Sequence, residues 1–379
     1  MIIFEKDCIG RSFLQIVFLN SGSIFFKDGV ANFAKEILNR GTSKKKEKFF
    51  SFLDENAINL NFGINHEYFT VSVKCLNNKR KKALDSLIEL FSDINLTKEA
   101  FEKTKREIIA KKESLKNNND YIANKNLYRA IFENTPLAIP VIGENIENIT
   151  KDDIKNFFNE LSENVIIING GEKFDYEKFI KLFPKKEKEY PFFEPIQKNI
   201  KENKEVEQSY IYFASEYNIE KKEIHLAKIA TFILGSGGFG SRIMEKIRVK
   251  KGYAYSAYAF NTFKKTHKIL SGYMQTKLEN TEDAINSLKN IINDFTQNGI
   301  TAEELNDAKK FLLGSEPLRN ETLSQRLLKK FNEVYLNLPE NYYQKELDLI
   351  KNTKLNEIND FIKKYKNIKN LSFSILTND

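Results

Sequence analysis

The sequence predicts an α+β protein of two homologous domains, each an α/β roll in which an antiparallel-type sheet is covered by helices. Three observations lead to this prediction. The length of 379 residues suggests two to three domains at roughly 150 residues each. Similar segments recur with a period of about 200 residues, which is the spacing of domains rather than of a solenoid. A proline-bearing stretch lies between the two copies.

The repeat is visible in two pairs of helical segments. Residues 83–88 open a helical stretch, and residues 284–289 open a similar one in the second half. Residues 154–158 recur in the same way as residues 358–362, each after a Thr-Lys dipeptide and before a run typical of a strand. The two halves are therefore expected to share one fold.

A linker is expected between the copies. Residues 184–206 carry several prolines among lysines and glutamates, and proline removes a backbone donor and disfavours helix in its neighbours. We predict an N-terminal domain over residues 1–183, the linker over 184–206 and a C-terminal domain over 207–379.

Each half is expected to run strand, helix, strand pair, two long helices, a further helix and a last strand. In the first half, residues 13–19 form an apolar run and residues 68–75 alternate with a period of two, as strands do. The other predicted strands are residues 164–169, 209–213, 254–260, 269–274 and 371–376. Helices and antiparallel strands in this mixture favour helices packed on one face of a sheet.

Composition excludes several classes of protein. Charged residues make up 30% of the chain with a net charge of +8, but no basic block alternates with aromatics, so we expect no nucleic-acid partner. No apolar run approaches the roughly 18 residues of a membrane helix. The first residues lack the order of a secretory leader; a leader could have been removed, so cytoplasm and periplasm both stay open. Cys8 and Cys75 are interpreted as buried free thiols, with a disulfide as the alternative.

Residues 28–39 form the amphipathic helix of most interest. Its apolar residues follow the i, i+3, i+4, i+7, i+8 rule; they are Val30, Phe33, Ala34, Ile37 and Leu38. Asp28 is predicted to cap the start and Gly41 to end the helix. The opposite, polar face carries Asn32, Lys35 and Glu36.

Residues 29–42, with their closing Gly-Thr, resemble the zinc helix of the pitrilysin/insulinase family of peptidases. In active members the polar face reads His-x-x-Glu-His: the two histidines bind zinc and the glutamate is the general base. This sequence has Asn32, Lys35 and Glu36 at those positions. The resemblance places the third zinc ligand of the family, a glutamate on a later helix, at Glu113.

The loss of the imidazoles has a severe chemical consequence. An asparagine is no zinc ligand of useful affinity, and the cationic Lys35 would repel a metal and cannot take a proton from water. We therefore expect no metal on this chain. Glu36 and Glu113 would form either a weak site for a hard cation or an acidic face paired with Lys35. The histidines are not spaced to replace the motif: they are His66, His225 and His267.

Residues 234–242 form a glycine-rich loop between a predicted helix over 223–234 and another over 241–250. The loop superficially resembles a dinucleotide fingerprint, but it follows a helix rather than a strand and no Gly-Lys-Ser/Thr is present. In non-catalytic members of the family such a loop is associated with substrate recognition, and tight helix packing is the alternative. The glycines concerned are Gly235, Gly237, Gly238 and Gly240.

Arg248 and Tyr255 match the second signature of the family, an arginine followed seven positions later by a tyrosine. Taken alone, Arg248 would be a cation at a helix C-terminus and Tyr255 a core residue. The resemblance implies instead that both side chains donate to the scissile carbonyl as it becomes an oxyanion, or to the neighbouring peptide backbone.

The resemblance covers the whole chain and implies a non-catalytic subunit, similar to the partners of bacterial processing proteases. A second, homologous chain would supply zinc and the His-x-x-Glu-His motif, and the substrate would be a peptide or an unfolded protein that adds to a sheet edge. The alternative is a structural or assembly subunit of a larger complex. Hydrolysis without metal has no candidate nucleophile in this sequence.

Overall fold

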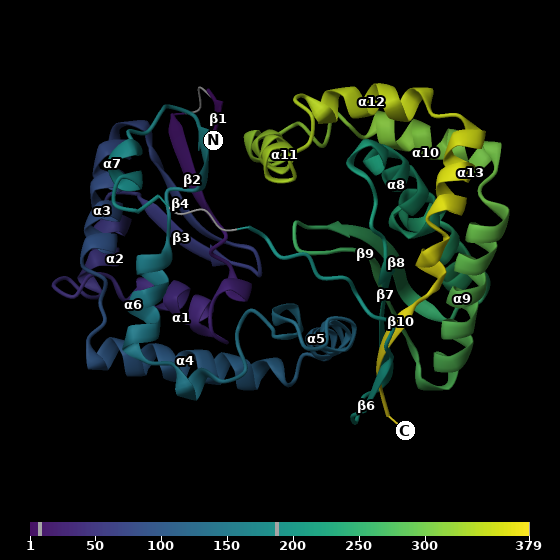
Figure 1. The fold of residues 1–379 in the computed structure, drawn as a ribbon, viewed down its shortest axis with the longest axis horizontal. Coiled ribbons are helices and arrows are strands. Elements are labelled where there is room, and N and C mark those ends of the chain that lie inside the picture. Colours follow the sequence, from purple (N-terminus) through teal and green to yellow (C-terminus); the bar gives the residue numbers. More distant parts are fainter. Residues whose placement is uncertain (7–9, 186–188, 379) are drawn as a thin grey trace. The chain divides into compact units, whose positions relative to one another are not determined.

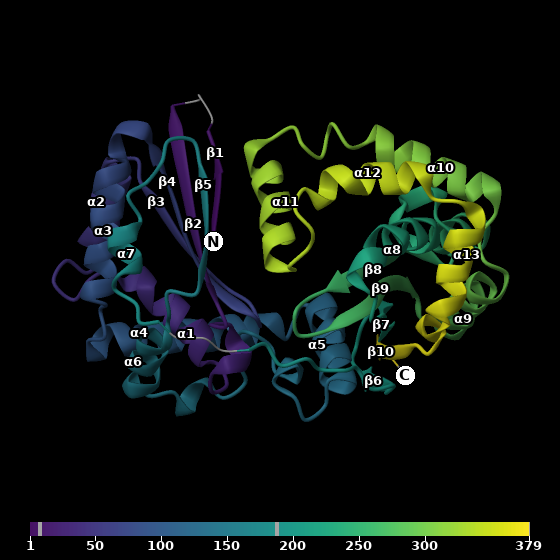
Figure 2. The same ribbon diagram turned by 45° about the horizontal axis from the view of Figure 1, so that its top comes forward.

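The computed structural model consists of two compact units and describes residues 1–6, 10–185 and 189–378. Each unit is built on one five-stranded sheet (Figures 1 and 2). Unit 1 comprises Met1–Ser114, Ile139–Tyr190 and Asn320–Asn337. Unit 2 comprises Leu115–Ala138, Pro191–Arg319 and Leu338–Asp379.

The sheet of unit 1 has the strand order β1-β5-β2-β4-β3. Its strands are β1 (Ile2–Glu5), β2 (Arg11–Leu19), β3 (Asn59–Ile64), β4 (Tyr68–Leu76) and β5 (Val165–Gly170). β1 pairs with β5 in parallel, and every other pairing in this sheet is antiparallel.

The sheet of unit 2 has the equivalent order, β6-β10-β7-β9-β8. Its strands are β6 (Ile200–Asn203), β7 (Gln208–Glu216), β8 (Ala254–Phe263), β9 (Lys268–Lys277) and β10 (Ser372–Thr377). Here too the first strand joins in parallel and the others pair antiparallel. The matching order confirms the prediction of one α+β fold used twice.

The helices repeat as well. Those up to residue 180 are α1 (Val30–Ile37), α2 (Lys48–Glu55), α3 (Arg80–Ser92), α4 (Lys98–Leu115), α5 (Asn119–Ile131), α6 (Lys151–Glu160) and α7 (Glu177–Ile180). The later ones are α8 (Ile224–Thr231), α9 (Thr281–Asn298), α10 (Ala302–Gly314), α11 (Leu323–Tyr335), α12 (Tyr342–Asn352) and α13 (Leu355–Lys364). The repeated segments of the sequence lie in α3 and α9, and in α6 and α13. The predicted capping box of Thr301 and Glu304 starts α10.

Each unit includes a helix that the sequence order assigns to the other half. α11, from the second half, belongs to unit 1 and packs on β5 and β1. Its buried side chains Leu327 and Phe331 join Ile3 and Ile168 in one apolar cluster. Gly170 on β5 leaves room for this helix, because a Cβ there would lie 2.9 Å from Leu327.

α5, from the first half, belongs in the same way to unit 2. Ile122 and Ala123 pack with Leu376 of β10. At the start of α5, Asp120 accepts a hydrogen bond from the hydroxyl of Tyr212 at 2.9 Å and from the amide of Gln275 at 3.1 Å. α5 and α11 each follow the long helix of their own half, so equivalent helices are exchanged between the halves.

A buried polar cluster ties α11 to the sheet of unit 1. Glu67, which is only 2% exposed, accepts a hydrogen bond from the hydroxyl of Tyr335 on α11. The hydroxyl of Tyr190 donates to the backbone oxygen of Glu67 at 3.1 Å. Burial raises the pKa of both phenols, so both stay protonated donors at neutral pH.

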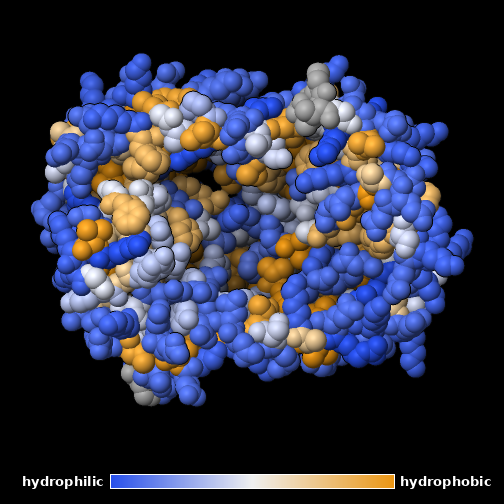
Figure 3. Space-filling view, turned by 180° about the vertical axis from the view of Figure 1, so that it is seen from behind, coloured by the Kyte–Doolittle hydropathy of each residue, from blue (hydrophilic) through white to orange (hydrophobic). Residues whose placement is uncertain are grey.

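The surface and the cysteine fit the composition. Polar and charged side chains cover most of the face seen in Figure 3, and apolar residues appear there in separate areas. Across the described residues, no helix has the length and apolar character needed to cross a bilayer.

Cys75 is a buried free thiol whose pKa is raised to about 11 by burial; Cys8 lies outside the described residues.

Tyr335→Phe should lower the free energy of unfolding by about 1–3 kcal/mol, because the buried carboxylate of Glu67 loses a donor. Urea denaturation followed by circular dichroism measures the difference. The matched control is Tyr255→Phe, at a tyrosine that is 80% exposed, and it should leave the midpoint unchanged. Equal midpoints for the wild type and Tyr335→Phe would contradict the role given to this hydrogen bond.

Candidate functional site

The start of α1 differs from its prediction. Gly29 occupies the N-cap position with φ 76°, and no side chain caps the helix. The prediction that Asp28 caps it was wrong, because the Asp28 carboxylate accepts instead from the backbone N–H groups of Glu144 at 2.9 Å and Asn145 at 3.0 Å. Asp28 therefore anchors the loop beside α1, and Gly41 (φ 67°) ends the following turn as expected.

The polar positions of α1 form an ion-paired cluster. The ammonium group of Lys35 is hydrogen-bonded to Oε1 of Glu36. A second ammonium group, from Lys111 on α4, lies 3.8 Å from the same oxygen. Asn39 donates to the other carboxylate oxygen at 3.2 Å. Asn32 is 6% exposed, and its amide nitrogen lies 3.5 Å from the oxygen of Ile142.

This cluster does not fit zinc. An amide stands where the family has its first imidazole, and the one carboxylate of α1 is already balanced by two cations. Glu113, which the resemblance places at the third ligand, is exposed on α4. Within the described ranges, no group of three or more His, Cys, Asp or Glu residues is placed to hold a metal ion. The geometry therefore favours the paired acidic face over a cation site.

The histidines occupy unrelated environments. The Nε2 atom of His66 lies 3.1 Å from the oxygen of Ile139. His267 is buried beside the rings of Tyr128 and Phe132. His225 is buried on α8, and burial lowers its pKa. These surroundings agree with local structural roles.

The glycine-rich loop packs tightly at one end and is open at the other. α8 continues as a wider helical turn (Phe232–Ser236), and a short turn (Gly238–Gly240) follows. A Cβ on Gly235 would lie 2.6 Å from the Cβ of Ala259 on β8, so only glycine allows this close approach. Gly238 has φ 65°, which favours glycine. Gly240 has open space around it.

Gly237 lies between these two situations. A Cβ there would come within 2.7 Å of the backbone oxygen of Phe232 and 3.1 Å of its ring. Packing thus explains Gly235 and Gly237, while Gly238 and Gly240 face free space on the outer side of the loop.

Arg242 fastens the end of this loop to α10. Its guanidinium donates to both carboxylate oxygens of Glu304, at 2.6 and 2.7 Å, and to the backbone oxygen of Gly299 at 2.8 Å. Burial acts to raise the pKa of Glu304, but the hydrogen bonds and charge of Arg242 hold it below its ordinary value. The helix that follows (Met244–Lys250) is therefore held by a bidentate ion pair.

Arg248 and Tyr255 lie together on unit 2. Arg248 comes from the helix Met244–Lys250, and its Cζ lies 4.8 Å from the centroid of the Tyr255 ring. Tyr255 is 80% exposed and sits at a register shift of β8, between residues 254 and 256. Such bulges re-aim a side chain. Neither the Arg248 guanidinium nor the Tyr255 hydroxyl makes a hydrogen bond or ion pair with another described residue, so the donors of both can receive a ligand.

Phe239 is a third member of this cluster, and sequence reasoning missed it. The Cζ of Arg248 lies 4.7 Å from the centroid of its ring, which is 64% exposed. The signal was present in the sequence: an aromatic residue between Gly238 and Gly240 has no apolar periodicity that would bury it. We call Phe239, Arg248 and Tyr255 the arginine cluster.

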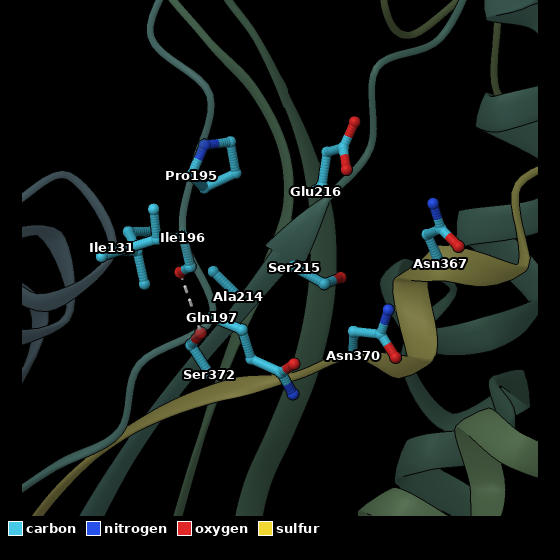
Figure 4. Close-up of a pocket in the computed structure, with 10 residues that line it drawn as sticks. All are labelled: Ile131, Pro195, Ile196, Gln197, Ala214, Ser215, Glu216, Asn367, Asn370 and Ser372. Atoms are coloured by element: carbon cyan, nitrogen blue, oxygen red, sulfur yellow. Dashed lines mark hydrogen bonds between the residues drawn. The ribbon is translucent and has the colours of Figure 1, made fainter.

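A separate polar pocket of about 110 Å³ lies in unit 2 at the end of β7 (Figure 4). The Oγ atom of Ser215 is buried there and has no hydrogen-bond partner in the described part of the chain. Carboxamides of Asn367 and Asn370 lie across from it. The lining contains no histidine or lysine, the side chains that most often activate a serine nucleophile.

Zinc binding can be tested by restoring the motif. The wild-type chain should contain no stoichiometric zinc after purification and dialysis against zinc. The triple variant Asn32→His, Lys35→Glu, Glu36→His should gain zinc, because it supplies two imidazoles on one face of α1. Inductively coupled plasma mass spectrometry measures the metal. The single variant Lys35→Glu, which lacks imidazoles, is the control, and tight zinc in the wild-type chain would refute the prediction.

Comparison with known proteins gives consistent matches. Residues 14–145 match the model of the insulinase family (peptidase family M16), and residues 148–312 match that of the peptidase M16 inactive domain. The chain is 37% identical to a protein of Helicobacter pylori named "non-peptidase homolog YmxG", over 100% of this chain and 91% of the relative. It is 23% identical to an "uncharacterized zinc protease YmxG" of Bacillus subtilis, over 86% and 83% of the two chains.

The fold is shared with solved structures. A crystal structure of a peptidase M16 inactive domain from Pseudomonas fluorescens superposes with a TM-score of 0.88 at 20% identity, covering 100% of this chain and 95% of that one. At this identity the likeness concerns the fold, and the two-unit architecture described above is the shared feature.

Proposed function

This chain belongs to the M16 (insulinase) peptidase family, and from that premise we propose that it is the non-catalytic subunit of a two-chain zinc peptidase. The observation that carries the proposal is a contrast between its two sites. The polar face of α1 is closed by the Lys35–Glu36 ion pair, whereas the donors of Arg248 and Tyr255 stand unpaired near the surface of unit 2. One site is disabled and the other is available.

The chemistry proposed for Arg248 and Tyr255 follows from their donors. A guanidinium offers several N–H groups in one plane, and a phenol offers one O–H group. Donors fixed before a reaction stabilise the negative charge that develops on a scissile carbonyl more effectively than water does. In the proposed complex both side chains act on a peptide whose cleavage depends on zinc in the partner chain.

The substrate would bind as an extended strand. β8 is the last strand in the order of its sheet and pairs only with β9 among the described strands. Its free edge presents backbone groups that a peptide can pair with, and Tyr255 lies at the beginning of this strand. A peptide added along β8 would pass the arginine cluster.

The proposed partner is a homologous chain with an intact His-x-x-Glu-His helix. Such a chain would carry the zinc and the general base that α1 lacks here. Affinity purification of this chain from its native cell, followed by mass spectrometry and metal analysis, tests the assignment. Recovery of a zinc-bearing homologue supports it, and recovery of a large assembly without one would support the alternative of a structural subunit.

Arg248→Ala and Tyr255→Phe should each lower the turnover of the reconstituted complex by about 10²-fold, since each removes donors to the developing oxyanion. Peptide cleavage followed by fluorescence at saturating substrate measures the loss. Lys250→Ala is the matched control: it removes a neighbouring cation, 3.9 Å from Glu245, outside the arginine cluster. Wild-type turnover in both cluster variants, with the complex intact on gel filtration, would rule out the proposed role.

A further inference from the structure

Two aromatic rings hold the guanidinium of Arg248. Its Cζ lies 4.7 Å from the ring centroid of Phe239 and 4.8 Å from that of Tyr255. The two rings make no contact with each other among the described residues, so they approach the guanidinium from different directions. Each distance is within the roughly 6 Å at which a cation is attracted to the face of a ring.

The position of Phe239 is fixed by its turn. Ser241 donates to the backbone oxygen of Gly238 twice, from its hydroxyl at 2.7 Å and from its backbone N–H at 2.9 Å. The next residue, Arg242, is held by Glu304. The aromatic ring between these points is 64% exposed. Exposure of this apolar area to water is unfavourable. The ring packs against the guanidinium of Arg248.

We infer that Phe239 is a positioning residue of the Arg248–Tyr255 site. It covers one side of the guanidinium with carbon and keeps the side chain in one orientation without an acidic partner. A ligand then reaches Arg248 through its N–H groups, which are left free for carbonyl or carboxylate oxygens. An aspartate or glutamate in place of Phe239 would hold the arginine through its N–H groups and so compete with a ligand for them.

This inference deepens the proposed function and rests on it for its biological purpose. It also assigns a role to the glycine-rich loop: Gly238, with its positive φ, and the open Gly240 present an aromatic ring to the arginine. The loop would act on substrate through Phe239, while Gly235 and Gly237 pack the loop against its own unit.

Nuclear magnetic resonance of the isolated, labelled chain tests the inference without any partner. The Nε–Hε signal of Arg248 is identified by its loss in Arg248→Lys. Because two rings lie over the group, the signal should be displaced upfield from that of the exposed Arg106. Phe239→Leu, which keeps bulk but removes the ring, should move it toward the position of Arg106, and Phe239→Trp should keep it upfield.

A titration with sodium acetate at constant ionic strength supplies the second measurement. Acetate presents the two oxygens that suit a guanidinium, and Phe239→Leu should weaken its effect on the Arg248 signal about two- to fivefold, the size of one exposed cation–ring contact. The control is Phe260→Leu, at another exposed aromatic residue, 43% exposed on β8, which should change neither readout.

The outcomes separate the two proposals. The inference would be overturned if Phe239→Leu changed neither the Arg248 signal nor the acetate response. It would also be overturned if Phe239→Trp behaved like Phe239→Leu. If the signals behave as expected but Arg248→Ala leaves cleavage by the reconstituted complex unchanged, the aromatic positioning stands and the proposed function fails.

Discussion

The ion pair of Lys35 and Glu36 lies on the face of α1 where active members of the family carry their zinc ligands. A zinc peptidase needs neutral imidazoles and a free carboxylate on one face of its first long helix. Here that face offers an amide, and its carboxylate is balanced by Lys35 and, at 3.8 Å, by Lys111. Replacing Lys35 alone would free the Glu36 carboxylate but would supply no imidazole ligand for zinc. The helix is amphipathic, and its polar side carries a partly buried ion pair where an active member of the family carries zinc ligands.

The two arginines beside the glycine-rich loop are held by different kinds of group. Arg242 donates hydrogen bonds to Glu304 and to the backbone oxygen of Gly299, so it stabilises the fold. Arg248, six residues later, is held by rings instead. Aromatic faces orient a cation without using its N–H groups, whereas a carboxylate would use them. The difference separates an arginine that maintains the fold from one that is available to a ligand.

Much of this could be predicted from the sequence. Period-two alternation located β4 and the amphipathic rule located α1, because burial on one face fixes the spacing of apolar residues. The repeat predicted that the two halves share one fold, but not the strand order of the sheets. The resemblance to the family also identified Arg248 and Tyr255, which the fold brings together. Phe239 was missed although its place between two glycines, outside any apolar pattern, indicated an exposed ring. The role of Asp28 was wrong because the backbone N–H groups that donate to its carboxylate lie more than a hundred residues away.

The exchange of α5 and α11 between the units could not be predicted either. The apolar pattern of a helix shows which of its faces is buried, but not which sheet that face packs against. Its consequence concerns the topology of the chain. A nick in the proline-bearing segment would not liberate two autonomous halves: the first would lose the helix that buries Ile3 and Ile168, and the second the helix that buries Leu376. Each half of the sequence supplies a helix to the core of the other unit. Either half expressed by itself would therefore have an incomplete core.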